Sequence, residues 1–513
     1  MRDKLKVLLV NPPITTRGND SSAEIFFPMG LAYLAGVIEK EKKVELFILD
    51  ALAEGGKKYG KNFCLAGLSF SEIKKRIIAI KPDVVGVTSM FTAYSNDTHE
   101  VAKIIKDIDK NILVVFGGSH ASCNYDQILK DKNVDFVVKG EGEETFLEFI
   151  RSVILNKDLK KIKGVVYRKG NKFIENQGRQ FIQNLDQLSF PARHLFQMSK
   201  YLLHKSPYIM RTPVAGVITS RGCPGHCVYC SIHAIWGHSW RGRSAKNVVD
   251  EIEELINNYG VREIAFFDDS ASLDKKRWNE ICDEIINRKI DIKWTTPNGI
   301  AHWTLDKPLL DKMKEAGCYR VTFGIESGNV ETRNFLGKPY PLSQAKELIQ
   351  HANMIGLWTI CTNIIGFPEE TRDQIEDTVK FAINSGTDFA LFYPLTPFRG
   401  TPIYNIFKEK GLLQNKEDKE LFITENTRDT VNFTKEEIAN IISEAYKRFM
   451  FSRILRYLFN PLNLTRKIHS IEDFKYLLRL GKSYFSLNIG LFKTGRMGAK
   501  IYYNSKKFEE KSI

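Results

Sequence analysis

Residues 219–231 read Thr-Ser-Arg-Gly-Cys-Pro-Gly-His-Cys-Val-Tyr-Cys-Ser, and their three cysteines, Cys223, Cys227 and Cys230, have C-x3-C-x2-C spacing. An apolar run at 215–219 precedes them, which predicts a tight loop at the C-terminal end of a strand. Thiolates this close repel one another unless a cation or a cluster neutralises them, and iron–sulfur clusters are held by such runs of cysteine.

The number of cysteines in this loop indicates what kind of cluster it holds. A closed electron-transfer cluster needs four thiolates, whereas the other five cysteines of the chain are single and scattered. Three thiolate ligands leave one iron of the cluster free to bind a substrate. A catalytic zinc likewise keeps one coordination position open. The alternatives are a structural zinc site completed by His226 or His233 and a chance spacing. The spacing is strongly specific and favours a [4Fe–4S] cluster.

The cysteine loop begins a series of six strand–helix repeats in residues 213–415. Six repeats fit a partial (βα)6 barrel better than the eight of a closed barrel. The predicted strands are 215–219, 263–267, 293–298, 320–324, 358–365 and 389–394. The predicted helices are 247–259, 277–287, 307–315, 342–355 and 371–383.

Residues 1–150 predict a second α/β domain in front of the barrel. Buried apolar runs alternate with helical patterns there, which indicates a doubly wound, Rossmann-like parallel sheet. In such sheets ligands lie outside the carboxyl ends of the strands. The predicted strands are 7–10, 45–49, 84–88, 113–116 and 136–138, and the predicted helices are 31–39, 71–80, 97–106 and 123–130.

The rest of the chain divides into a connector and a tail. Residues 151–212 form the connector, in which 164–174 has the apolar–turn–apolar pattern of a hairpin. Residues 416–513 form a helical, basic C-terminal region. A chain of 513 residues is too long for one core and agrees with several domains.

Composition and cysteine use suggest a cytoplasmic protein. No stretch approaches the ~20 apolar residues that span a bilayer, and the apolar run at 7–10 ends at Asn11-Pro12-Pro13, too short for a signal peptide. Eight cysteines in a long chain of this kind favour metal or redox chemistry over a disulfide framework.

The net charge of +14 is concentrated in the tail. Residues 446–508 contain 14 basic residues and two acidic ones. The predicted helix at 447–459 places Arg453 and Arg456 opposite an apolar face. That face consists of Phe451, Ile454, Leu455 and Leu458. We expect these helices to pack on the open side of the barrel and cap the substrate pocket. One alternative is peripheral contact with an anionic membrane. The other is that the basic region binds an anionic substrate or a nucleic acid.

The cysteine loop resembles that of the radical S-adenosylmethionine (SAM) superfamily. The resemblance implies that the open iron chelates the amino and carboxylate groups of SAM and that electron transfer cleaves SAM to a 5′-deoxyadenosyl radical. Tyr229 matches the aromatic residue before the last cysteine, which implies packing near the adenine.

Further matches to this superfamily lie at successive strand ends. Residues 266–270 resemble the segment near the SAM amino group, 324–328 the ribose and carboxylate contact, and 363–371 the G-F-P-x-E-T turn near the adenine. The cofactor contacts that this implies are Asp268, Asp269, Glu326, Ser327, Gly366 and Pro368. Residues 397–401 resemble the P-x-P-G-T stretch, with Arg399 in place of a proline. Ala301 departs from the family, where relatives often have arginine.

The N-terminal domain resembles the cobalamin-binding half of B12-dependent radical SAM proteins. Residues 28–36 are the strongest match, followed by Asp50, 117–121 and 140–143. The cofactor contacts expected at the sheet edge are Thr88, Ser89, Gly117, Gly118, His120, Gly140 and Glu141. The alternative is a generic doubly wound domain that binds no B12.

No histidine follows the first strand of this domain, where many cobalamin domains have one in a D-x-H-x-x-G loop. Asp97-Thr98-His99 mimics that motif on a helix, so we interpret His99 as a surface residue. His120 is expected to line the pocket of the nucleotide tail. The resemblance therefore implies cobalamin without a protein imidazole on cobalt.

Together these features predict a radical SAM enzyme with a [4Fe–4S] cluster, SAM and cobalamin. The leading hypothesis is a cobalamin-dependent methyltransferase that acts on an unactivated carbon of a small molecule. The alternatives are a radical cyclase or rearrangement enzyme, similar to anaerobic porphyrin-ester cyclases, and a B12-binding sensor. A methylthiotransferase fits poorly, because only Cys64 and Cys123 lie in the N-terminal domain. We expect a low-potential electron donor such as flavodoxin or ferredoxin, and no nucleic acid partner.

Overall fold

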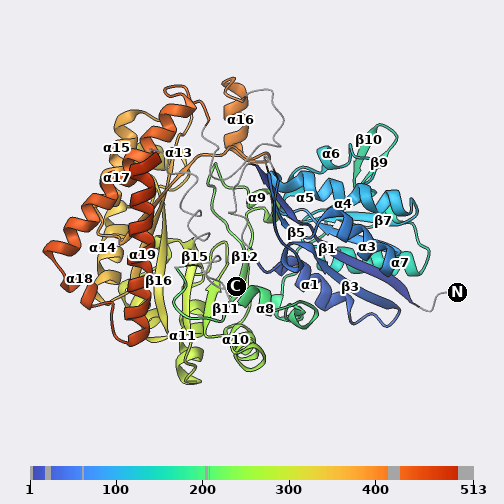
Figure 1. The fold of residues 1–513 in the computed structure, drawn as a ribbon, viewed down its shortest axis with the longest axis horizontal. Helices are drawn as coiled ribbons and strands as arrows, with labels where there is room; N and C mark the ends of the chain where they lie inside the picture. The colour runs from blue at the N-terminus through green and yellow to red at the C-terminus, as the bar shows by residue number, and fades with distance from the viewer. Residues whose placement is uncertain are drawn as a thin grey trace. The chain divides into compact units, whose positions relative to one another are not determined.

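The computed structural model describes residues 4–17, 25–60, 63–202, 206, 208–413 and 428–494. They belong to two compact units, one comprising most of residues 1–201 with Ala234–Trp236, the other most of residues 202–513. Each unit contains one large sheet with helices packed around it (Figure 1).

The sheet of the first unit is built on strand β1 (Leu5–Asn11), whose residues 7–10 are wholly buried. The other strands are β3 (Val44–Asp50), β6 (Val84–Thr88), β7 (Leu113–Gly117), β8 (Phe136–Val138), β9 (Val165–Lys169) and β10 (Lys172–Glu175). Their order is β10-β9-β8-β7-β6-β1-β3, and the five strands from β8 to β3 are parallel. The predicted doubly wound parallel sheet is confirmed.

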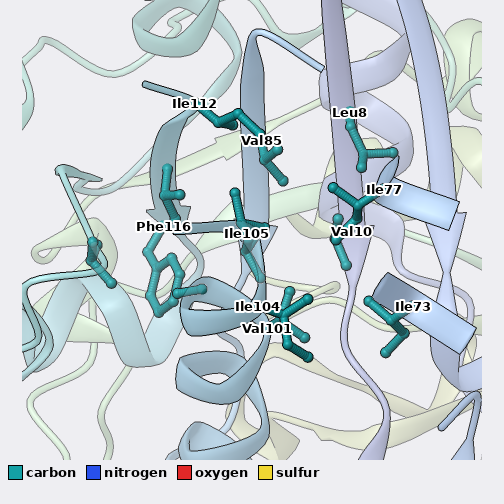
Figure 2. Close-up of a cluster of buried hydrophobic side chains, with 14 of the residues drawn as sticks. Leu8, Val10, Ile73, Ile77, Val85, Val101, Ile104, Ile105, Ile112 and Phe116 are labelled. Atoms are coloured by element: carbon teal, nitrogen blue, oxygen red, sulfur yellow. The ribbon is translucent and has the colours of Figure 1, made fainter. Parts of the chain in front are cut away.

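Alternate residues of β1 face two helical layers. Leu8 and Val10 pack in one cluster with side chains of α3 (Phe70–Ile80) and α4 (Ser95–Ile108), as Figure 2 shows. Leu9 faces the other layer, since a Cβ added to Gly86 of β6 would meet both Leu9 and Phe146 of α7 (Glu143–Ile154). Helix α1 (Met29–Ile38) packs against α7.

Three local features of this unit differ from the sequence predictions. Strands β2 (Ile14–Arg17), β4 (Gly56–Tyr59) and β5 (Phe63–Gly67) form a small antiparallel sheet that was not predicted, because β4 is exposed throughout and has no apolar alternation. The predicted hairpin forms, but β9 also pairs with β8 and so extends the large sheet. The helix predicted at 123–130 is broken at Asn124, which separates α5 (Ser119–Cys123) from α6 (Tyr125–Ile128).

The sheet of the second unit is a six-stranded parallel sheet, as predicted. Its strands, in spatial order, are β11 (Val214–Val217), β14 (Glu263–Phe266), β15 (Lys293–Ile300), β16 (Cys318–Glu326), β17 (Trp358–Ile365) and β18 (Phe389–Pro394). Within the part of the chain that the structure describes, β11 and β18 do not pair with each other, so the barrel is open. The crossover helices are α10 (Ala245–Tyr259), α11 (Lys275–Asn287), α12 (Lys307–Glu315), α14 (Leu342–Met354) and α15 (Arg372–Asn384).

The tail packs on this barrel through helix α17 (Lys435–Phe459). Ile438, Ile441 and Phe449 of α17 lie in one buried cluster with residues of β18 and α15. The helix begins beside the end of β17, where the Val431 N–H donates to the Pro368 carbonyl at 2.8 Å. The tail therefore packs on the barrel as a helix beside α15, against the edge strand β18.

The second half of α17 has the arginines and the apolar face on opposite sides, as predicted, and the side with the arginines is the one that packs on the barrel. Arg453 is buried and donates to the Ile383 carbonyl, and Arg456 donates to the Gly386 carbonyl. Both carbonyls lie at the end of α15, where backbone oxygens lack helical partners. The predicted apolar face points outward instead, with Phe451, Ile454, Leu455 and Leu458 all exposed.

The last described helices, α18 (Leu462–Thr465) and α19 (Ile471–Thr494), are anchored at the N-terminal ends of the barrel strands. Lys467 is wholly buried, with its Nζ 2.7 Å from Asp388 Oδ2 and 2.8 Å from Asn353 Oδ1. Tyr476 of α19 lies against Tyr319 and Trp358 at the starts of β16 and β17. These anchors are at the opposite end of the barrel from the cysteine loop, so the described α18 and α19 do not cap a pocket there.

We predict that Lys467→Met lowers the free energy of unfolding by about 3–5 kcal/mol, because it leaves the Asp388 carboxylate buried without its cation. Chemical denaturation of the full chain measures the change. The control is Lys475→Met, which alters an exposed lysine of α19 and should cost under about 0.5 kcal/mol. Equal losses in the two variants would contradict this role of the buried pair.

Candidate active site: a three-cysteine loop at the strand ends

The cysteine loop follows β11 and is held at its base by a short hairpin. Strand β12 (Ser220–Gly222) pairs antiparallel with β13 (Trp240–Gly242), which fixes both ends of the intervening loop. The predicted strand at 215–219 thus ends at Val217. The Gly222 N–H donates to Asp269 Oδ2 at 2.9 Å, which ties the loop to the end of the neighbouring strand β14.

Two of the three thiols of the loop, those of Cys223 and Cys227, lie beside Gly225. A Cβ added to Gly225 would lie 3.4 Å from Cys223 Sγ and 3.8 Å from Cys227 Sγ. The Cys230 N–H donates to the Cys227 carbonyl at 3.1 Å, and the Cys230 thiol is close enough to Cys223 and Cys227 for their charges to act on it. The three predicted ligands are therefore brought together.

The electrostatics of these thiols require a positive partner. Burial, together with the charges of Cys227 and Cys223, raises the pKa of Cys230 to about 12. Burial also raises the pKa of Cys227. Thiolates form here only beside a strong cationic centre. In the described residues no three His, Cys, Asp or Glu side chains are arranged around a single ion. A cubane cluster has a different requirement, because each thiolate binds a separate iron.

Three histidines stack beside the loop. The rings of His226 and His238 have centroids 4.1 Å apart, and those of His233 and His238 lie 4.4 Å apart. His238 Nδ1 lies 2.8 Å from the Gly225 carbonyl oxygen, within hydrogen-bonding distance. The histidines proposed for a zinc site are thus part of a ring stack, which favours the cluster interpretation.

Glu326 and Lys338 form a buried ion pair next to the cysteines. Lys338 Nζ lies 2.9 Å from Glu326 Oε1 and 5.8 Å from the centre of the Tyr229 ring. Burial lowers the pKa of Lys338, but the charges of Glu326 and Cys227 outweigh this effect and its net pKa is raised. Glu326 has a left-handed backbone with φ of 66°, a strained conformation that is common at functional sites.

The side chains of two other predicted SAM contacts, Asp268 and Ser327, form hydrogen bonds with neighbouring side chains and backbone. Asp268 is buried, and its Oδ1 accepts hydrogen bonds from Thr219 and Ser220. Its Oδ2 has no hydrogen-bond partner among the described residues. Ser327 is wholly buried, and its Oγ lies 3.1 Å from Thr378 Oγ1. The two side chains thus form hydrogen bonds within the protein just after the ends of β14 and β16.

The loop after β17 contains Gly366 and Pro368. Gly366 has φ of 100°, and its N–H donates to Glu370 Oε2 at 2.8 Å, so the Glu370 carboxylate fixes the turn. Burial raises the pKa of Glu370 to about 7, although hydrogen bonds from Gly366 and Phe367 act in the opposite direction. Glu370 Oε1 has no hydrogen-bond partner among the described residues.

In the first unit, the predicted cobalamin contacts gather at the carboxyl ends of the strands. The Ser89 N–H donates to the Gly117 carbonyl, and the His120 N–H donates to the Ser89 carbonyl. Gly118 has φ of 106° and approaches Ser89 so closely that a Cβ would lie 2.8 Å from its carbonyl oxygen. Thr88 ends β6 beside them and pairs with Gly117.

This edge has features that fit a bound ligand. The Ser89 hydroxyl is buried and has no hydrogen-bond partner among the described residues. A Cβ added to Gly117 would meet nothing within 4 Å, so the space beside that backbone is open. Gly140, with φ of 75°, donates its N–H to Ser122 Oγ at 3.0 Å. Glu141 instead accepts a hydrogen bond from the Ile182 N–H, which secures the connector.

His99 and His120 of this unit have contacts at Nδ1 of their rings. His99 Nδ1 lies 2.7 Å from Asp131 Oδ2. His120 Nδ1 lies 2.9 Å from Thr92 Oγ1 and 3.1 Å from Asn124 Nδ2. His120 is therefore held in a polar network at the sheet edge.

The sequence analysis missed Lys338 and the aromatic pair beside it. Trp303 and Tyr340 stack with centroids 3.9 Å apart, and Lys338 Nζ lies 5.8 Å from the Trp303 ring. The sequence signal that could have identified Lys338 is its position among apolar residues, shortly after Glu326. Trp303 and Tyr340 belong to separate loops, so no spacing in the sequence links them.

Comparisons with known proteins agree with this site. Residues 217–382 match the family model of the radical SAM superfamily, and residues 18–150 match that of the B12 binding domain. An uncharacterized methyltransferase of Pyrococcus horikoshii is 35% identical over 446 residues, which cover 87% of this chain and 92% of that protein. The cytidylyl-2-hydroxyethylphosphonate methyltransferase of Streptomyces wedmorensis is 31% identical over 80% of this chain and 83% of its own.

Solved structures share the fold. The radical SAM methyltransferase TsrM from Kitasatospora setae has a TM-score of 0.63 at 18% identity, covering 79% of this chain and 75% of its own. The cobalamin-dependent radical SAM enzyme OxsB has a TM-score of 0.66 at 14% identity, covering 99% of this chain and 75% of its own. The chain therefore belongs to the family of cobalamin-dependent radical SAM methyltransferases. Its cofactors are a [4Fe–4S] cluster, SAM and cobalamin.

We predict that Glu370→Gln alters how stability depends on pH. A carboxyl whose pKa rises from 4.5 to about 7 on folding stabilises the fold most below about pH 4.5 and loses that contribution as the pH rises to about 7. Glutamine keeps an acceptor for the Gly366 N–H and does not titrate. The variant should therefore gain on the order of 1–3 kcal/mol relative to wild type between about pH 5 and about pH 8.

Denaturant unfolding at the two pH values measures this gain. The matched control is Glu369→Gln, which changes the exposed neighbouring carboxylate and should leave the pH dependence as in wild type. A pH dependence in Glu370→Gln equal to that of wild type would contradict a raised pKa for the buried Glu370.

Proposed function

We propose that this enzyme transfers a methyl group from SAM, by way of cobalamin, to an unactivated carbon of a small molecule, with Cys223, Cys227 and Cys230 holding the cluster. The observation that carries the proposal is a loop whose three thiols act on one another electrostatically, with two of them beside Gly225 and no fourth cysteine in the loop. The remaining five cysteines lie in other strands and helices of the two units. The three-ligand loop supports a cluster with one iron open to SAM.

The chain's own side chains would bind and orient SAM at the strand ends. Tyr229 supplies a flat ring next to the third cysteine, and the Lys338 ammonium is a cation that a carboxylate can approach beside Glu326. The turn fixed by Glu370 presents backbone groups of Gly366 to the same end of the sheet. When bound, the cluster supplies the electron that cleaves SAM, and cobalamin supplies the methyl carrier. The aromatic pair Trp303 and Tyr340 would help to exclude water.

The edge of the first sheet would bind cobalamin. Ser89 offers an unused hydroxyl, and Gly117 and Gly118 let a ligand approach the backbone. We propose that cobalamin is bound without a protein imidazole on cobalt, because no histidine follows β1, where many cobalamin domains have one. A weak lower ligand makes homolytic methyl transfer easier.

The electron needed for SAM cleavage would come from a low-potential donor such as flavodoxin or ferredoxin. We place the enzyme in the cytoplasm, because none of the eight cysteines forms a disulfide and such thiols are maintained in a reducing compartment. None of the described helices is long and apolar enough to cross a membrane.

The second candidate is a radical cyclase or rearrangement enzyme. The anaerobic magnesium-protoporphyrin IX monomethyl ester cyclase of Rubrivivax gelatinosus is 27% identical over 90% of this chain and 80% of its own. The methyltransferases named above have higher identity, which supports methyl transfer as the first choice.

The products of SAM distinguish the two reactions. Anaerobically reconstituted enzyme, given cobalamin, reductant, SAM and a small-molecule extract of its own cells, should release S-adenosylhomocysteine and 5′-deoxyadenosine in about equal amounts. Cys227→Ala should release no 5′-deoxyadenosine, whereas Cys318→Ala, a buried cysteine at the start of β16, should behave as wild type. 5′-Deoxyadenosine without S-adenosylhomocysteine, while product forms, would favour the cyclase or rearrangement reaction.

A further inference from the structure

We propose that the outer face of α17, α18 and α19 binds an anionic lipid surface. This outer face is defined by its most exposed apolar side chains, together with the exposed Lys447, Arg466, Lys475 and Arg479. The apolar members are Phe451, Leu458, Phe459, Leu462, Ile471 and Leu478.

The exposure of these side chains is extreme for large apolar residues. Phe459 is 83% exposed, Ile471 75% and Leu458 70%. A row of such residues on successive helices of one region marks an interaction surface rather than the scattered exposure of an ordinary protein surface.

The orientation of α17 explains why this surface persists in the folded chain. Arg453 and Arg456 are directed inward by hydrogen bonds to the Ile383 and Gly386 carbonyls, and Tyr457 donates to Asp388 Oδ1 at 2.5 Å. Turning the helix to bury its apolar face would break these bonds. The polar side is thus fixed to the barrel, and the apolar side is left for a partner.

The three helices meet at one end of the barrel. Tyr457 of α17 and Lys467, which follows α18, both contact Asp388, while Tyr476 of α19 and Lys467 both contact Trp358. Their inner sides therefore converge on the N-terminal ends of β17 and β18. The outer face lies over the same end, away from the cysteine loop at the C-terminal ends of the strands.

The charge of this region selects an anionic surface. Residues 446–508 contain 14 basic residues against Glu472 and Asp473. Glu472 pairs with Arg211 and Arg262, and Asp473 is largely buried and accepts from Ser470. Both acids are therefore engaged within the chain, and the exposed charges of the described outer face, on Lys447, Arg466, Lys475 and Arg479, are positive. Leucine, isoleucine and phenylalanine flanked by lysine and arginine are typical of interfacial helices that insert into the headgroup region.

The test is co-sedimentation of the full-length protein with vesicles. We expect binding to vesicles of phosphatidylcholine with about one third phosphatidylserine, and at least tenfold weaker binding to phosphatidylcholine alone. Leu458→Glu/Phe459→Glu should reduce binding to the anionic vesicles about tenfold or more. The matched control is Ile78→Glu/Leu155→Glu, which adds the same charges at exposed apolar positions of the first unit and should bind as wild type does.

Three results would overturn the proposal. The first is no binding of the intact chain to anionic vesicles at physiological salt, and the second is equal binding by the α17 variant and its control. The third is a change of oligomeric state in the Leu458→Glu/Phe459→Glu variant, seen by analytical ultracentrifugation, which would assign the outer face to a second copy of the chain. An unchanged melting temperature and unchanged SAM cleavage in both variants confirm that they are folded. Because vesicle binding needs no turnover, it is independent of the reaction proposed above.

Discussion

The close approach of three thiols in one partly buried loop is the constraint on which the site depends. Burial raises the pKa of Cys227 and Cys230, so these thiols would remain protonated without a cationic partner. An iron–sulfur cluster supplies that positive charge and takes one thiolate at each of three irons. The β12–β13 hairpin and the bond from Gly222 to Asp269 hold the loop in a shape that makes this possible.

The same constraint explains the charged groups around the loop. Lys338 adds a positive charge near Cys227, and its pairing with Glu326 keeps that charge from being buried alone. These residues come from the strand ends and loops of a parallel sheet, which is where such folds place ligands. The first sheet follows the same rule, with Ser89, Gly117 and His120 at its carboxyl edge.

Much of the fold could be predicted because buried parallel strands have a strong sequence signal. The run at 7–10 is apolar and wholly buried, and all six barrel strands were found within a few residues. The β2-β5-β4 sheet was missed because β4 reads Gly-Lys-Lys-Tyr and is exposed along its length. The tail was predicted to be helical, with Arg453 and Arg456 opposite an apolar face, but which of the two faces packs on the barrel was not predicted. The backbone carbonyls of Ile383 and Gly386 that attract Arg453 and Arg456 lie about 70 residues away in sequence and cannot be read from the helix itself.

The site was predicted in part. The cysteine triad and Glu326 come together, whereas Asp268 and Ser327 form hydrogen bonds within the protein.

The central claim is that three thiolates hold a cluster with one iron open to SAM. Electron paramagnetic resonance of the reduced, reconstituted enzyme tests it most directly. The account predicts a [4Fe–4S]+ signal whose g-values shift when SAM is added. A cluster signal that SAM leaves unchanged would contradict it.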